Sequence, residues 1–190
     1  MWIADLMQFH RVSYYVGLLT AAAMYGAAHQ QPQEFQVVAG AILRPIVIAR
    51  VRIRFFFRRE MNDAITQPMK ASNGYIPTST PEMTTFDLVR YRKSSSSIDH
   101  IATVISDLSE QLEPRRLEEV ANRSNEAPVI QRLGFLLDAV QRSDLAEPLV
   151  EWIRKKNTKY VPLEPGNSLQ GATRNSRWRI LVNTSIEVES

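Results

Sequence analysis

Cysteine is absent from this chain of 190 residues. Its absence excludes disulfide bonds, thiolate catalysis, and zinc or iron–sulfur sites built on cysteine. Histidine is scarce as well: the chain has only His10, His29 and His100, and no two of them stand at a spacing typical of metal ligands, such as i and i+4. We therefore expect no metal site and no cofactor.

Long apolar runs are also missing. No Asp, Glu, Lys or Arg occurs from Val12 to Gln33, but the apolar part, Tyr14 to Ala28, has only about 15 residues, fewer than the ~20 needed to span a bilayer. A secretory signal peptide is the alternative interpretation, because the run ends in small residues; Asp5 in the preceding segment and the late start of the run argue against it. We expect a buried N-terminal helix here, and a cytoplasmic chain that does not contact a membrane.

Signatures of catalysis are missing too. The stretch GYIPTSTPEMTTFDLVRY, Gly74–Tyr91, changes from a strand pattern to a helix pattern at a sharp turn. A phosphate-binding turn would need glycines at the helix start, and a nucleophile elbow would need Gly-x-Ser-x-Gly. Instead, Thr80 suits the N-cap, Pro81 the first helical position and Glu82 the positive end of the helix dipole. We interpret the turn as structural and the chain as not an enzyme.

Charge is present, with a small excess of cations that gives a net charge of +3. Its clearest pattern is the alternation that begins at Arg50 in ARVRIRFFFRRE. Strand geometry places two sets of side chains on opposite faces. One set is Val51, Ile53, Phe55 and Phe57, and the other is Arg50, Arg52, Arg54, Phe56 and Arg58.

This arginine face is the candidate binding site for nucleic acid or another anionic partner, and it comprises Arg50, Arg52, Arg54, Phe56, Arg58 and Arg59. Arginines along a strand could follow phosphates, and Phe56 could stack with a base. An acidic protein surface is a second possible partner. The alternative is a solvated strand face whose charges prevent edge pairing. Lys70 and Arg90 could extend the face, but the sequence does not place them beside it.

The hydrophobic period changes midway along the chain. Residues 1–93 predict a packed N-terminal helix and a small mixed, mostly antiparallel sheet, with a hairpin at Asn73-Gly74. After the polar linker KSSSS, residues 98–156 carry apolar stripes of helical period and predict an α-helical bundle segment. Residues 160–190 predict a loop and a terminal strand, RWRILVN, that returns to the first sheet. The predicted fold class is α+β.

The segment QRSDLAEPLVEWIRKK, residues 141–156, has a short turn between two predicted helices. Asp144-x-x-Glu147 has the spacing of a capping box, which predicts the start of the second helix. The basic residues at its end favour a helix-turn-helix for DNA binding, but a recognition helix carries polar and basic residues in its first turn, and this turn is acidic and apolar. We interpret the segment as a structural hairpin whose final cations favour the helix dipole.

The segment TSTPEMTTFDLVRY resembles the Ser-x-Pro-Glu-x-Thr-x-x-Asp-Leu motif of the AbiEi family, the antitoxins of type IV, abortive-infection toxin–antitoxin systems of bacteria. Four further blocks resemble the family in the same order: YYVGLLTAAAMYGAAHQQPQEFQVV, RVRIRFFFRRE, VIQRLGFLLDAV and RWRILVN. The resemblance runs from about Tyr14 to the end of the chain.

The resemblance implies a C-terminal antitoxin domain that neutralises a nucleotidyltransferase toxin in phage defence, without a stable toxin–antitoxin complex. Members usually also carry an N-terminal winged helix-turn-helix, which binds operator DNA and makes the full-length protein a transcriptional autorepressor. Residues 1–13 are too few for that domain, so we expect it to be absent from this chain, DNA binding to be weak and the chain to be a monomer. The alternative function is a stand-alone nucleic-acid-binding module that uses the arginine face.

Overall fold

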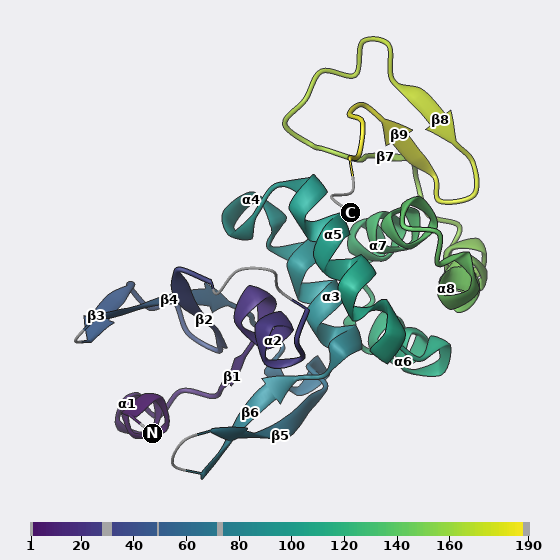
Figure 1. Ribbon diagram of the computed structural model, residues 1–190. Helices are drawn as coiled ribbons and strands as arrows, with labels where there is room; N and C mark the ends of the chain where they lie inside the picture. Colours follow the sequence, from purple (N-terminus) through teal and green to yellow (C-terminus); the bar gives the residue numbers. More distant parts are fainter. Residues whose placement is uncertain (1, 28–31, 49, 72–73, 188–190) are drawn as a thin grey trace.

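A six-stranded sheet forms one end of the molecule in the computed structural model, which describes residues 2–27, 32–48, 50–71 and 74–187 (Figure 1). Its strands are β1 (Tyr14–Val16), β2 (Glu34–Ala39), β3 (Ile46–Ile48), β4 (Val51–Phe57), β5 (Thr66–Ala71) and β6 (Gly74–Ser79). They lie in the order β3-β4-β2-β1-β6-β5. β4 with β2 and β1 with β6 pair in parallel, and the other neighbours are antiparallel. The mixed, mostly antiparallel sheet is thus confirmed.

The apolar run that begins at Tyr14 starts as a strand, so the prediction of one helix from that residue is wrong. Gly17 separates β1 from the helix α2 (Leu18–Met24). Two tyrosines and a valine favour the extended chain in β1, whereas the following residues are mostly Leu and Ala, which favour a helix. α2 ends before Gly26, whose positive φ of 78° allows the chain to turn away.

Two hydrophobic cores lie on opposite faces of the sheet. The smaller core forms against α1 (Trp2–His10), whose Ile3 and Met7 pack with sheet residues such as Ile53. The larger core joins the other face, through Tyr15 and Phe56, to α2 and the helices beyond it. The sheet is therefore covered on both sides along part of its length.

The turn between β6 and α3 (Pro81–Arg90) has the predicted geometry. The Thr80 hydroxyl accepts a hydrogen bond from the Met83 amide at 3.3 Å, and Pro81 occupies the first turn. β5 and β6 form the predicted hairpin, in which Ala71 pairs with Gly74. Asn73, at its predicted turn, lies outside the described residues. The hairpin leads the chain directly into α3.

Helices occupy the centre of the molecule (Figure 1). They are α4 (Arg92–Ser95), α5 (Ile98–Leu108), α6 (Pro114–Ser124), α7 (Ala127–Ala139) and α8 (Ser143–Lys156), with the single-turn 3-10 helices η1 (Met61–Asp63) and η2 (Ser109–Gln111). The predicted apolar stripes face the larger core. Within the described ranges, no helix has both the length and the apolar composition needed to cross a membrane.

α5 begins at Ile98, where the sequence predicts the helical part to start, but two other local predictions differ from the structure. The first residues of the predicted polar linker KSSSS belong to the short helix α4, and Ser97 caps α5 by accepting a hydrogen bond from the His100 amide at 3.3 Å. The capping box at Asp144 is not formed, because α8 already begins at Ser143. The Asp144 carboxylate instead pairs with Arg142 at 3.1 Å. In both places, polar side chains serve a neighbouring turn rather than the predicted one.

The last three strands form a separate sheet, so the prediction that the terminal strand returns to the first sheet is wrong. β7 (Val161–Pro162), β8 (Thr173–Asn175) and β9 (Ile180–Val182) lie in the order β7-β9-β8. Figure 1 shows them beyond α7, on the far side of the helices from the six-stranded sheet. The helical layer thus stands between the terminal strand and both edges of the first sheet.

α7 holds the small sheet through side-chain hydrogen bonds and through the packing of Trp178 against Gly134. The Gln131 side-chain amide donates to the carbonyl oxygens of Lys159, Trp178 and Arg179 at 2.9–3.1 Å. Trp178 is fully buried, and its indole N–H donates to the Asp138 carboxylate at 2.5 Å. A Cβ atom on Gly134 would overlap the indole ring. The small sheet is therefore an integral part of the helical core.

We predict that Gly134→Ala destabilises the protein by at least about 2 kcal/mol, because the new methyl group displaces Trp178. Alanine in a helix normally stabilises it by ~1 kcal/mol relative to glycine, so the sign of the change is informative. Urea unfolding measures the difference. Gly166→Ala is the control, since its Cβ meets no atom within 4 Å, and it should change stability by less than about 0.5 kcal/mol. A Gly134→Ala protein as stable as wild type would contradict the packing of Trp178.

Candidate functional site

Side chains alternate along β4 as predicted, but the buried side chains change face along the strand. Ile53, near its start, is fully buried against the core beside α1. Phe56, near its end, is 5% exposed and lies in the larger core on the opposite face. The prediction that Phe56 lies on a solvated arginine face is therefore wrong, because the far end of that face is covered by helices.

Arg58 is not on the surface either. Its side chain is 1% exposed, and its guanidinium NH1 pairs with Asp87 Oδ1 at 3.3 Å. The Arg58 Nε–H also donates to the carbonyl oxygen of Glu60 at 3.0 Å. The arginine face is consequently shorter than the sequence predicts, and its last arginine belongs to the interior.

The remaining arginines of the face share a carboxylate. Glu34, at the start of β2, lies opposite Arg52 in the parallel pair with β4. Glu34 pairs with Arg52 at 3.0 Å and with Arg54 at 3.5 Å, while these two side chains remain 59% and 38% exposed. Arg50 and Arg59 are exposed before and after the strand. The structure therefore leaves these four arginines near the surface and places a negative charge between two of them.

Arg90 extends this surface, whereas Lys70 does not. The Arg54 guanidinium lies 5.3 Å from the centre of the Phe56 ring, whose centre is 5.3 Å from that of Tyr91. Arg90 lies on Tyr91 at 5.4 Å and pairs with Glu126. Lys70 lies on β5, at the opposite edge of the sheet from β3 and β4. Two neighbouring aromatic rings thus lie between a cation of β4 and a cation of α3.

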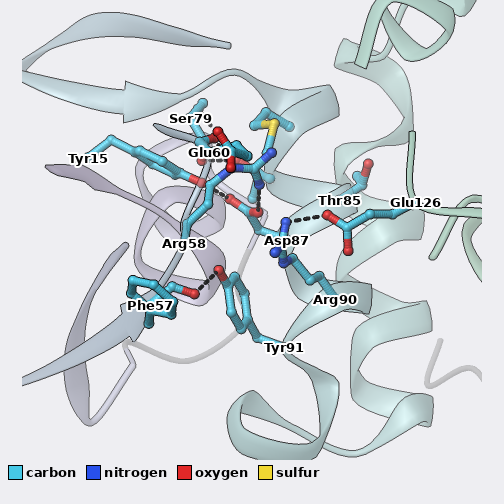
Figure 2. A network of polar contacts seen from close by, with 12 residues as sticks. Tyr15, Phe57, Arg58, Glu60, Ser79, Thr85, Asp87, Arg90, Tyr91 and Glu126 are labelled. Carbon is cyan, nitrogen blue, oxygen red and sulfur yellow. Dashed lines mark hydrogen bonds and ion pairs between the residues drawn. The ribbon is translucent and has the colours of Figure 1, made fainter. Parts of the chain in front are cut away.

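A buried polar network lies behind this surface, where β1, β4 and α3 meet (Figure 2). The Tyr15 hydroxyl donates to Asp87 Oδ2 at 2.7 Å, and Arg58 reaches the other carboxylate oxygen. Asp87 and Arg58 are both inaccessible to solvent. The Tyr91 hydroxyl closes the network at the outside by donating to the carbonyl oxygen of Phe57 at 2.7 Å. A buried carboxylate needs such partners, since it is costly without them.

The surroundings change the acidity of this network. Burial raises the pKa of Asp87 to about 6, although the charge of Arg58 and the hydrogen bond from Tyr15 both act to lower it. Burial, with the nearby Asp87 charge, raises the pKa of the Tyr15 hydroxyl well above its usual value. Attraction to Asp87 raises the pKa of Arg58 despite its own burial. At neutral pH these directions give an ionised Asp87–Arg58 pair with a neutral Tyr15.

The other polar residues of the β6–α3 turn also have partners inside the protein. The hydroxyls of Ser79 and Thr84 lie 2.7 Å apart. Glu82, fully buried, accepts a hydrogen bond from the Glu113 amide at 3.1 Å and so joins α3 to the start of α6. These contacts satisfy the hydroxyls of the turn and one of the two Glu82 carboxylate oxygens, whereas Glu82 Oε2 is buried without a hydrogen-bond partner among the described residues. The bonded hydroxyls support the interpretation of the turn as structural.

Sequence reasoning missed the partners of Asp87. Tyr15 and Arg58 lie 72 and 29 residues before it in the chain. No local pattern connects such positions. The available signal was the motif itself, which places a carboxylate between the apolar residues Phe86 and Leu88 of a helix.

One comparison with known proteins identifies the family. Residues 15–139 match the family model of the AbiEi antitoxin C-terminal domain. No curated protein sequence matches the chain. Among solved structures, the RV2827C protein from Mycobacterium tuberculosis has a TM-score of 0.61 at 16% identity, over 88% of this chain and 61% of that one. An antigenic nucleotidyltransferase-like protein from Paracoccidioides brasiliensis has a TM-score of 0.45 at 11% identity, over 77% and 88% of the two chains. The likeness to RV2827C shows a shared fold, and this chain spans about three fifths of that protein's length.

We predict that Asp87→Asn alters how stability depends on pH. The folded state binds the Asp87 proton more tightly than the unfolded chain does, because its pKa is raised to about 6 from 3.8. The stability from this group is therefore fully present below the unfolded pKa and is lost as the pH rises through about 6. Between pH 7 and pH 5, wild type should gain about 1 kcal/mol relative to Asp87→Asn.

Urea unfolding of both proteins across this pH range measures the difference. Glu118→Gln, which removes an exposed carboxyl on α6, is the control and should follow the wild-type profile. Parallel profiles for wild type and Asp87→Asn would contradict the raised pKa.

Proposed function

The chain belongs to the AbiEi antitoxin C-terminal domain family, and on that premise we propose that it neutralises a nucleotidyltransferase toxin. The observation that supports this proposal most directly is the family match over residues 15–139, about two thirds of the chain. The match includes the β6–α3 turn and the buried Asp87 network.

We propose that neutralisation requires no reaction catalysed by this chain. The hydroxyls of Ser79 and Thr84 are bonded to one another, and the Asp87 carboxylate is held by Arg58 and Tyr15. A nucleophile or general base must reach a substrate, but these groups are buried and already have partners. They support the surface that acts on the toxin system rather than forming a reaction site.

For the surface that meets an anionic partner, we propose Arg50, Arg52, Arg54 and Arg59, extended by Arg90. Its exposed arginines support this proposal, and Glu34 limits it by neutralising part of the charge. Phe56 and Arg58, which are buried, would not contact the partner but would pack beneath this surface and hold it in position. A stand-alone nucleic-acid-binding function for this face stays a prediction, which the shared carboxylate weakens.

The regulatory part of the proposal concerns a longer protein. We propose that operator binding and autorepression belong to a separate DNA-binding domain, while this domain acts as a cytoplasmic monomer without a stable toxin complex. The greater length of RV2827C is consistent with an additional domain in proteins of this fold.

Co-expression with the nucleotidyltransferase encoded beside its gene is the direct test. We expect this chain alone to restore growth, because the antitoxin domain needs no DNA-binding domain for neutralisation. Growth curves and a blot for soluble antitoxin are the measurements. Persistent toxicity in the presence of soluble antitoxin would refute the proposal.

The non-catalytic part has its own test. Ser79→Ala should still rescue growth at a temperature at which the variant is folded, because its hydroxyl has a structural role. Thr80→Ala, which loses about 1 kcal/mol through the missing cap, is the matched control for general destabilisation. Loss of rescue by a Ser79→Ala protein that melts like wild type would show that this hydroxyl acts in a reaction.

A further inference from the structure

Positive charge is concentrated near the end of the chain. Residues 151–182 contain seven Lys or Arg and two Glu, a net charge of +5 in a chain whose total is +3. The rest of the chain therefore has a net charge of −2. This segment comprises the second half of α8 and the small sheet, and it lies outside the residues matched by the family model. Such a local excess attracts anionic partners more strongly than the overall charge suggests.

The small sheet has one covered face and one open face. Ile180 on β9 is fully buried on the side of α7. Because side chains alternate, Leu181 and its cross-strand neighbour Arg174 point the other way. Pro162, the neighbour of Leu181 on β7, shares this direction with Tyr160 two residues earlier. The Arg174 guanidinium lies 5.5 Å from the centre of the Tyr160 ring, which places both on the open face.

The end of α8 adds cations beside this face. Arg179, at the start of β9, donates to the Asn157 side-chain oxygen at 3.0 Å and to the carbonyl oxygen of Thr158. These bonds fix the small sheet next to the last turn of α8. We define the C-terminal basic face as the cations and the aromatic residue of these adjoining segments, Lys155, Lys156, Lys159, Tyr160, Arg174 and Arg179.

The nearby carboxylates have other partners. Glu151 pairs with Arg154 at 2.5 Å, and Arg177 is held by Asp138 and Glu147. Among the described residues, no ion pair holds Lys155, Lys159 or Arg174, and all three are exposed. The C-terminal basic face therefore differs from the arginine face on β4, where Glu34 neutralises two arginines.

We propose that the C-terminal basic face binds single-stranded nucleic acid, with its lysines and Arg174 on phosphates and the Tyr160 ring stacked on a base. An open sheet face with an aromatic ring among cations offers both contacts that a single strand needs. Tyr160 is 40% exposed, so part of its ring is available. A duplex hides the faces of its bases, and an acidic peptide would use the cations but leave the ring unused. This activity goes beyond neutralisation of a toxin and does not depend on it.

Fluorescence anisotropy with a labelled RNA strand of about 12 nucleotides, within the ~4–16 that one such surface covers, tests the proposal. A DNA strand and a DNA duplex of the same sequence are the comparison probes. We expect Lys155→Gln/Lys159→Gln/Arg174→Gln to weaken single-strand binding at least tenfold and to flatten the log–log salt dependence by about 2, since each lost phosphate contact contributes ~0.7. The two single strands together show whether the face distinguishes RNA from DNA.

Variants of the ring separate stacking from charge. Tyr160→Ala should weaken binding about tenfold with an unchanged salt slope, and Tyr160→Phe should bind like wild type. The matched charge control is Arg115→Gln/Arg123→Gln, two exposed arginines of α6 that belong to neither candidate surface, and it should change the affinity less than about twofold. Circular dichroism and melting curves confirm that each variant is folded.

Several results would overturn the proposal. One is a loss of affinity in Arg115→Gln/Arg123→Gln as large as in the C-terminal variant. A second is an equal affinity for the single strand and the duplex, combined with no effect of Tyr160→Ala on that affinity. A third is that the protein binds labelled polyglutamate but no oligonucleotide. Absence of binding to every probe would overturn it as well. Growth rescue is read separately, so a failure here leaves the antitoxin role untouched.

Discussion

The carboxylate of Asp87 joins three parts of the chain that are distant in sequence. It lies on α3, accepts a hydrogen bond from Tyr15 on β1 and pairs with Arg58 at the end of β4. A charge buried so completely is tolerated only while its partners remain, and removing one leaves the other uncompensated at a cost of ~3–5 kcal/mol. The relative positions of the sheet and the helical layer depend on this contact. The apolar cores on either side supply most of the stability, and the network fixes how they fit together.

The features that could be predicted from the sequence are local ones. The turn at Thr80 follows from one hydroxyl, one proline and one acid within three residues, and the helical stripes follow from a repeating period. The failures that change the candidate surfaces involve contacts between distant residues. Alternation shows that Phe56 and Arg54 share a strand face, but not that helices cover one of them and leave the other at the surface. Nor does a strand pattern reveal its partner, and so the terminal strand was assigned to the wrong sheet.

The two candidate surfaces differ in how much of each can be identified from the sequence alone. The arginine face was visible in the sequence, but its membership changed once Arg58 proved to be internal and Arg90 proved to be a neighbour through Tyr91. The C-terminal basic face was not visible as a unit, because Tyr160 and Arg174 meet only when a strand lies between them. The Asp87 network lies within the family match, whereas the C-terminal segment 151–182, with a net charge of +5, lies beyond it. The Asp87 network and the C-terminal basic face are thus separate parts of the same molecule.

The packing of Trp178 against Gly134 also affects how the protein folds during its synthesis on the ribosome. A chain grows from its N-terminus, so α7 leaves the ribosome before the tryptophan that covers it. Trp178, whose indole N–H donates a hydrogen bond to Asp138, is synthesised 40 residues after Asp138. Until then, the groove beside Gly134 is an open apolar surface, the kind of surface that chaperones recognise and that promotes aggregation. If translation stops before the small sheet is made, the helical core is released without Trp178, and the surface of α7 beside Gly134 stays uncovered. This holds even though every residue of the family match has then been synthesised.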